Sequence, residues 1–140
     1  MVQKEVGQRM TAKPGGKDYG ALSVTVKYFS ESSIAFIVPP HCFIPQPGVD
    51  SCVVKLDVRK EAPFELEDRD YFFKVVKASF GQRRKMLTNS LANAGYLGVS
   101  RQQVLEALES MGKDEKIRGE TLSPEEFGKL SDFLHKKAEK

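Results

Sequence analysis

The sequence has no long hydrophobic run. No stretch of about 18 consecutive apolar residues occurs, so its 140 residues contain no segment expected to span a membrane. The N-terminus also lacks the basic-then-apolar pattern of a signal peptide, and we therefore expect a cytoplasmic location. With 40% hydrophobic and 29% charged residues, the composition is typical of a soluble globular protein and excludes a wholly disordered one.

Cysteine and histidine are scarce. Cys42 and Cys52 are too few for a disulfide framework and lack the spacing of metal ligands. We expect both to be buried or half-buried free thiols, with one disulfide across the loop between them as the alternative. His41 and His135 are isolated in the sequence from carboxylate or cysteine clusters, so we expect no metal site.

Acidic residues are absent between Asp70 and Glu106. The basic residues in that interval are Lys74, Lys77, Arg83, Arg84, Lys85 and Arg101. Clustered positive charge without compensating acids is expected of a phosphate-binding surface. The alternative is a solvated basic helix face, and the net charge of only +3 does not decide between the two.

Residues 1–59 are expected to form the edge of a larger α/β layer structure. The short β-branched runs Ile34–Val38 and Cys52–Val58 predict strands, and two strands cannot bury both faces of a sheet. The segment Ala21–Phe29 is ambiguous, because its β-branched bias favours a strand whereas the spacing of its apolar residues favours a helix. The apolar residues that fit a helical face are Leu22, Val26 and Phe29.

Residues 60–140 have a helical pattern almost throughout, after a charged linker that contains Pro63. Four amphipathic segments each carry one apolar face, which predicts a small bundle. Ser100 with Gln103 and Ser123 with Glu126 are capping boxes for the third and fourth helices. The four apolar stripes begin at Phe72, Leu87, Val104 and Phe127.

Four prolines lie between the two predicted strands. They are Pro39, Pro40, Pro45 and Pro47. Each fixes its own φ, removes a backbone donor and favours an extended conformation in the residue before it. We expect a stiff, extended connection that holds one large aromatic residue, Phe43, at its middle.

This connection resembles a known motif. Residues 43–51, Phe-Ile-Pro-Gln-Pro-Gly-Val-Asp-Ser, are similar to the Phe-x-Pro-x-Pro-x-Val-x-Ser motif of the rRNA adenine N6-dimethyltransferases, the family of the kasugamycin-sensitivity and erythromycin-resistance methylases. Residues 1–24 resemble the segment that follows the family's catalytic Asn-Leu-Pro-Tyr motif. Residues 80–91, which include Phe-Gly-Gln-Arg-Arg-Lys-Met-Leu, and residues 118–127, which begin Arg-Gly-Glu-Thr-Leu-Ser, resemble the small-subunit rRNA branch.

The resemblance implies a function. Members of this family bind S-adenosylmethionine in a Rossmann-like domain and transfer two methyl groups to each of two adjacent adenines. It implies that Phe43 stacks on the target adenine, and that the partner is small-subunit rRNA or the pre-small ribosomal subunit. We expect a monomer. The residues expected to contact the RNA backbone are Lys77, Arg83, Arg84 and Lys85.

The sequence also departs from the family. No glycine-rich loop follows a strand and opens a helix, so no cofactor-binding residue is assigned, and Asn-Leu-Pro-Tyr is absent. Gly48 stands where many relatives carry a lysine, which leaves no phosphate contact there. Arg118 and Glu120 are expected to form a structural ion pair or cap.

These departures predict the C-terminal half of such an enzyme, inactive alone. Residues 1–59 would be the end of the Rossmann-like methyltransferase domain, and residues 60–140 a helical rRNA-binding domain. The alternatives are a non-catalytic RNA- or ribosome-binding module and, more weakly, an unstable gene fragment.

Overall fold

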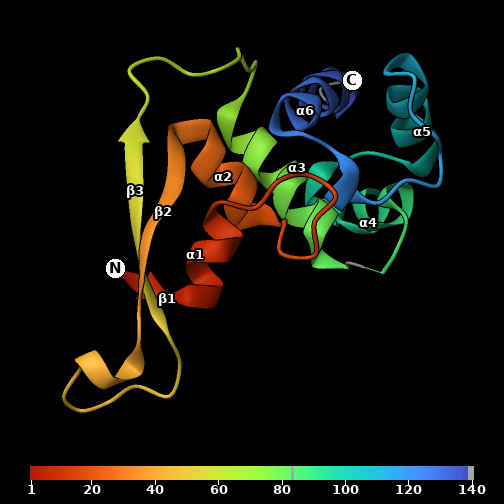
Figure 1. Cartoon of the computed structure of the whole chain (residues 1–140). Helices are drawn as coiled ribbons and strands as arrows, with labels where there is room; N and C mark the ends of the chain where they lie inside the picture. Colours follow the sequence, from red (N-terminus) through yellow and green to blue (C-terminus); the bar gives the residue numbers. More distant parts are fainter. Residues whose placement is uncertain (83, 139–140) are drawn as a thin grey trace. The chain divides into compact units, whose positions relative to one another are not determined.

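The computed structural model describes residues 1–82 and 84–138. The chain forms two compact units, Met1–Pro63 and Phe64–Lys140, which run from red to yellow and from green to blue in Figure 1. The division thus falls four residues after the boundary expected at residue 59.

The first unit combines a small antiparallel sheet with two helices. Its elements are β1 (Val2–Gln3), α1 (Lys4–Met10), α2 (Ala21–Phe29), β2 (Ser30–Val38), the 3₁₀ turn η1 (Pro40–Cys42) and β3 (Ser51–Val58). Both predicted strands are confirmed, and the strand order among the described residues is β1-β3-β2. β3 runs antiparallel to both neighbours, with Val2 opposite Cys52 and Ile34 opposite Val54.

A bulge interrupts the β2–β3 ladder between Ile34 and Phe36. Ile34 pairs with Val54, whereas Phe36 pairs with Val53, so the extra residue on β2 moves Phe36 to the opposite face from Ile34. Phe36 is 58% exposed on that face. The mixed α/β character is as expected, and the place of this sheet at the edge of a Rossmann-like domain stays a prediction.

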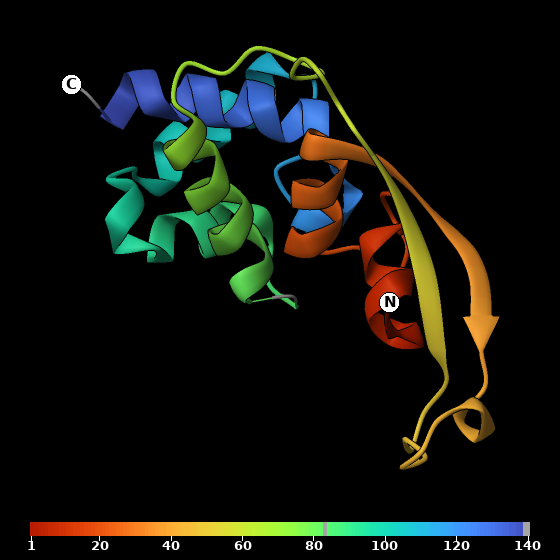
Figure 2. The ribbon, with the colours of Figure 1, turned by 90° about the vertical axis from the view of Figure 1, so that its left-hand side faces the viewer.

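Helices α1 and α2 lie on one face of the β2–β3 hairpin (Figure 2). α1 approaches β3 so closely that a Cβ at Gly7 would lie 2.2 Å from Cys52 Sγ and 3.2 Å from Val54 Cγ2. Only glycine therefore fits at this position of α1. Cys52 itself is completely buried beneath the helix.

The ambiguous segment Ala21–Phe29 is a helix, and it buries a different face from the one expected. Its buried residues are Ser23, Val24 and Tyr28, whereas Leu22 and Phe29 are exposed. The Ser23 hydroxyl donates to the carbonyl of Arg9 in α1 and accepts from the Gly20 N–H at 3.1 Å. The serine, rather than the expected apolar stripe, thus faces α1.

The second unit contains the four helices predicted from periodicity. They are α3 (Arg69–Gly81), α4 (Leu87–Asn93), α5 (Arg101–Ser110) and α6 (Pro124–Ala138), with 3₁₀ turns η2 (Gly95–Leu97) and η3 (Gly119–Thr121) between them. Both capping boxes form: the N–H groups of Gln103 and Glu126 each donate to the serine hydroxyl at 3.2 Å. Each cap satisfies a backbone donor that the helix leaves unpaired, which stabilises the helix by about 1 kcal/mol.

The four helices share one core. Its fully buried large side chains include Phe72, Leu87, Leu91, Leu108, Phe127, Leu130 and Leu134. Burying a side chain of this size contributes about 1.5–3 kcal/mol. A Cβ at Gly128 of α6 would lie 2.9 Å from the Phe64 ring, so glycine also allows the start of the unit to pack directly against α6.

No helix in the described ranges is long and apolar enough to cross a membrane.

Glu126 links the N-terminus of α6 to the segment after α5. Its carboxylate accepts from the Ser123 N–H at 2.9 Å and forms an ion pair with Lys113. Burial alone would raise the pKa of Glu126, but the hydrogen bonds from Lys113 and Ser123 outweigh it and hold the pKa below its ordinary value.

We predict that Glu126→Gln reduces the acid sensitivity of the fold. Because the pKa is depressed in the folded state, the stabilisation is complete above the ordinary value of 4.5 and is lost as the pH falls through the folded-state value. Urea unfolding at pH 6.5 and pH 3 measures this loss. Glu125→Gln changes an exposed carboxylate on the same turn and should keep the wild-type pH dependence. An equal loss in both variants would contradict the prediction.

Candidate functional site

The proline-rich loop 39–50 connects β2 to β3. Pro39 is extended, at φ −67° and ψ 156°, but residues Pro40–Cys42 then form the 3₁₀ turn η1. The N–H groups of Cys42 and Phe43 donate to the carbonyls of Pro39 and Pro40, both at 3.2 Å. The expectation of an extended connection is therefore wrong for this part of the loop. Proline is compatible with the turn, since the first positions of a helical turn need no N–H donor.

Phe43 ends this turn in an extended conformation, at φ −121° and ψ 151°, and its side chain is half-buried. It makes no stacking contact with another aromatic ring in the described ranges. Ile44 beside it is fully exposed, and the Ile44–Pro45 peptide is cis. The loop thus presents a partly exposed aromatic side chain next to an exposed aliphatic one, and the role of Phe43 in stacking stays a prediction.

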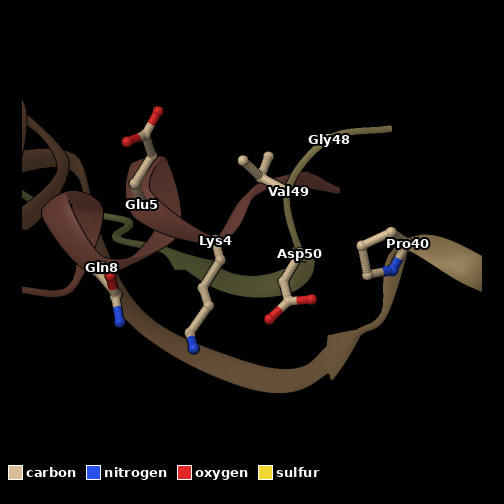
Figure 3. Close-up of a pocket in the computed structure, with 7 residues that line it drawn as sticks. All are labelled: Lys4, Glu5, Gln8, Pro40, Gly48, Val49 and Asp50. Atoms are coloured by element: carbon tan, nitrogen blue, oxygen red, sulfur yellow. The ribbon is translucent and has the colours of Figure 1, made fainter. Parts of the chain in front are cut away.

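A cavity of about 450 Å³ lies between this loop and the start of α1. Its lining residues are Lys4, Glu5, Gln8, Pro40, Gly48, Val49 and Asp50. The backbone N–H of Lys4 donates to the carbonyl of Asp50 at 2.9 Å, which fixes the end of the loop against the first residue of α1. In Figure 3 the side chains of Lys4, Gln8 and Asp50 extend toward the lower side of the view, whereas Glu5 and Val49 extend upward.

The sheet topology explains why the cavity and the loop lie together. β1 and β2 are both antiparallel to β3, so they run parallel to each other and end at the same edge of the sheet. α1 follows β1 at this edge, and loop 39–50 follows β2. In α/β proteins the carboxyl ends of parallel strands are the usual place for a ligand.

The basic residues of the second unit are exposed. Lys74 and Lys77 lie on α3, and Arg84 and Lys85 lie between α3 and α4. Within the described part of the chain, none of these four forms an ion pair. Their charge is therefore available to an external anion. Arg83, also expected to bind RNA, lies outside the described residues.

A hydrogen bond extends the basic surface to α5. Arg101 Nη1 donates to Asn89 Oδ1 at 2.8 Å, which places the first residue of α5 against α4. Arg118 and Glu120 approach to 4.0 Å, so the expected structural ion pair is present in a loose form.

Two expectations about cysteine and histidine need correction. Both cysteines are free, but Cys42 is exposed rather than buried. His135 is not isolated in the fold, since Nε2 lies 3.3 Å from Asp68 and Nδ1 lies 3.7 Å from Glu67. Among residues 1–82 and 84–138, no three histidine, cysteine, aspartate or glutamate side chains are grouped so that they could hold a metal ion.

The described residues do not form a nucleotide cofactor cradle. β1 passes directly into α1 without an intervening glycine-rich turn. Gly15, at φ 86°, lies in a turn before α2 that follows a helix and not a strand. Gly7 contacts the Cys52 thiol and leaves no room for a ligand.

A family model described as ribosomal RNA adenine dimethylase matches residues 1–136. The chain belongs to this family. The resemblance read from its motifs is confirmed.

Curated relatives and solved structures agree with this family. The chain is 53% identical over 137 residues to "Ribosomal RNA small subunit methyltransferase A" of Clostridioides difficile, covering 98% of the chain and 47% of the relative. It is 51% identical over 134 residues to the protein of the same name from Moorella thermoacetica, covering 96% and 46%. The dimethylase-family chain thus spans about half the length of the curated relatives it matches.

Among solved structures, a dimethyladenosine transferase from Plasmodium falciparum matches with a TM-score of 0.75 and 26% identity, over 91% of this chain and 53% of that one. The 23S rRNA methyltransferase ErmE has a TM-score of 0.60 at 24% identity, over 95% and 52%, which supports the fold alone.

Sequence reasoning missed the cavity at the end of β1. Lys4, Gln8 and Asp50 belong to no recognisable motif of metal or nucleotide ligands, and more than 40 residues separate Asp50 from the other two. The only signal in the sequence was the position of Asp50, which lies two residues before the predicted strand Cys52–Val58.

We predict that the two thiols differ in accessibility. Cys42 in the loop should react with a maleimide in the native chain, whereas Cys52 beneath α1 should react only after unfolding. Mass spectrometry should show one label in buffer and two in denaturant. Cys42→Ser is the control and should show none in buffer. Native labelling of Cys52 at the same rate as Cys42 would contradict the packing of α1 on β3.

Proposed function

We propose that this chain supplies the RNA-recognising part of an S-adenosylmethionine-dependent rRNA adenine N6,N6-dimethyltransferase. The substrate is a pair of adjacent adenines in small-subunit rRNA or the pre-small ribosomal subunit, and the enzyme is a monomer. The observation that carries the proposal is family membership over residues 1–136, together with a partly exposed Phe43 at the carboxyl edge of the sheet.

Methylation of an adenine amine depends on placement. The amine is a weak nucleophile, so the reaction gains most from holding it in line with the methyl group of the donor. To reach such a site, the base leaves its stack and is held by an aromatic surface and by hydrogen bonds to its edge. Phe43 provides that surface, because the 3₁₀ turn fixes its backbone and its ring stacks on no other ring of the described chain.

S-adenosylmethionine supplies the methyl group in this family. The described residues do not form its binding site, so no step of the transfer is assigned to them. In this proposal the sheet of the first unit is one edge of a Rossmann-like domain. The exposed apolar side chains Phe36, Leu56 and Val58 support that placement, since a β-sheet normally buries such residues against another layer.

The basic surface of the second unit binds the RNA backbone. Exposed cations without acidic partners release counterions when they meet phosphates, which drives association without regard to sequence. Lys77, Arg84 and Lys85 meet this condition, and we extend the same role to Arg83 on its place in the sequence.

A non-catalytic RNA- or ribosome-binding module is the second candidate. The lack of a cofactor cradle in the described residues favours it. Such a module would use the same RNA-binding surface as the enzyme, but Phe43 would have no role in methyl transfer.

A chimeric enzyme tests the catalytic proposal. This chain replaces the matching 137 residues of the Clostridioides difficile relative, and methylation of unmodified small-subunit rRNA is measured. We expect dimethyladenosine from the chimera. Phe43→Ala should lower kcat/KM by about ten- to a hundredfold, because stacking on an aromatic side chain contributes about 1–3 kcal/mol per base.

Phe43→Tyr is the matched control and should retain most of the activity, since it keeps the stacking face. A chimera that binds the RNA but forms no methyladenosine would favour the non-catalytic module. Equal activity of the Phe43→Ala and Phe43→Tyr variants would remove the stacking role.

The basic surface has a separate test. In the 140-residue chain, Lys77→Glu with Lys85→Glu should weaken binding to small-subunit rRNA and lower the slope of log K against log salt by about one to two. Lys116→Glu with Lys129→Glu makes the same change in net charge at exposed lysines elsewhere in the second unit. Similar losses in both pairs would show a non-specific charge effect and no defined surface.

A further inference from the structure

The cavity beside the Phe43 loop is lined by polar side chains that the fold does not use. The ammonium of Lys4, the amide of Gln8 and the carboxylate of Asp50 have no hydrogen bond or ion pair with any residue the structure describes. Figure 3 shows these three extending to the same side of the ribbon. Three unused polar groups of different type around one cavity are typical of a binding site that fixes the orientation of its ligand.

We propose that this cavity, the Lys4–Asp50 pocket, binds a guanine base next to the target adenine in the RNA. The inference rests on the proposed function, which supplies the RNA. The pocket and Phe43 share one loop, because Pro40, Gly48 and Val49 contribute to the lining on either side of the aromatic residue. In this proposal a nucleotide in the pocket is the neighbour of the base at Phe43.

The charges of the lining favour a base over a phosphate. Lys4 and Asp50, which extend to the same side, carry opposite charges, and the second carboxylate of the lining, Glu5, extends to the other side, so the cavity offers a phosphate no net positive charge. A nucleobase is neutral and offers N–H donors that a carboxylate can accept. The volume of about 450 Å³ lies in the range of small-molecule sites.

Guanine is the base that best matches the carboxylate of Asp50 and the ammonium of Lys4. Its Watson–Crick edge presents two adjacent donors, N1–H and the 2-amino group, beside the acceptor O6. The two donors suit the two oxygens of one carboxylate, as in Asp50, and O6 suits the ammonium of Lys4. Adenine, cytosine and uracil each lack that pair of adjacent donors. The Pro40 ring and Val49 provide apolar contacts for the base.

Gly48 offers a way to close the pocket without disturbing the fold. A Cβ at Gly48 would meet no atom within 4 Å, and its φ lies outside the left-handed region. A large side chain is therefore tolerated by the backbone there, and it would project at the rim of the cavity. Gly48→Phe is the blocking variant.

Nucleotide titration tests the assignment. The isotope-labelled 140-residue chain is titrated with GMP, IMP, AMP, CMP and UMP, and amide chemical shifts are recorded. GMP should shift the resonances of Lys4, Gln8 and Asp50 and bind about tenfold more tightly than IMP, which lacks the 2-amino group. Gly48→Phe should abolish these shifts.

Asp50→Asn should remove the preference for GMP over IMP, because an amide offers one acceptor where the carboxylate offers two. Asp57→Asn, the same change on β3 away from the cavity, should leave that preference intact. Equal binding of all five nucleotides, shifts confined to other residues, or no shift at 10 mM GMP (about −2.7 kcal/mol) would overturn the proposal.

This test is independent of methyl transfer. If the chimera is active but the pocket does not bind GMP, the guanine assignment is wrong and the proposed function is retained. GMP binding in the pocket with an inactive chimera would retain the base site and reject the enzymatic function.

Discussion

One backbone hydrogen bond joins the parts of the first unit that matter for function. The N–H of Lys4 donates to the carbonyl of Asp50 at 2.9 Å, directly after the two paired residues of β1 and directly before β3 begins. It therefore fixes the first turn of α1 to the last residue of loop 39–50. The cavity lies at this point, and both residues that the bond joins line it. The turn that carries Phe43 is anchored at its other end by β2.

In the second unit, the buried and the exposed faces of the helices have separate roles. Their inner faces form a shared apolar core, and side chains cap the N-termini of α3, α5 and α6. This leaves Lys74, Lys77, Arg84 and Lys85 without acidic partners in the described part of the unit. The cost of such a surface is the repulsion between its positive charges, and the phosphates of an RNA backbone relieve that repulsion.

Much of this fold could be predicted from the sequence, because local signals determine it. Capping residues and apolar periodicity located the helices of the second unit, and β-branched runs located β2 and β3. The prediction failed where tertiary contacts decide. Ser23 of α2 faces α1 and bonds to the carbonyl of Arg9, which is 14 residues away in the sequence. The 3₁₀ turn at Pro40 was missed for another reason, because its local main-chain bonds are ones that the proline rules do not forbid.

The candidate site was predictable only in part, for the same reason. Phe43 was found through a motif, whereas the pocket depends on the pairing of Val2 with Cys52, which no local pattern encodes. His135 likewise meets Glu67 and Asp68 only through the packing of α6.

Because of the bulge in β2, the number of residues in this strand determines the direction in which the site faces. Because side chains alternate along a strand, the one extra residue between Ile34 and Phe36 decides which surface of the hairpin carries each later side chain up to Pro39. Loss of one residue from β2 would turn that whole stretch over relative to α1. A residue added within loop 39–50, after the last pair of the ladder, would only lengthen the loop. Insertions and deletions among natural relatives should therefore be rarer in the strand than in the loop that it supports.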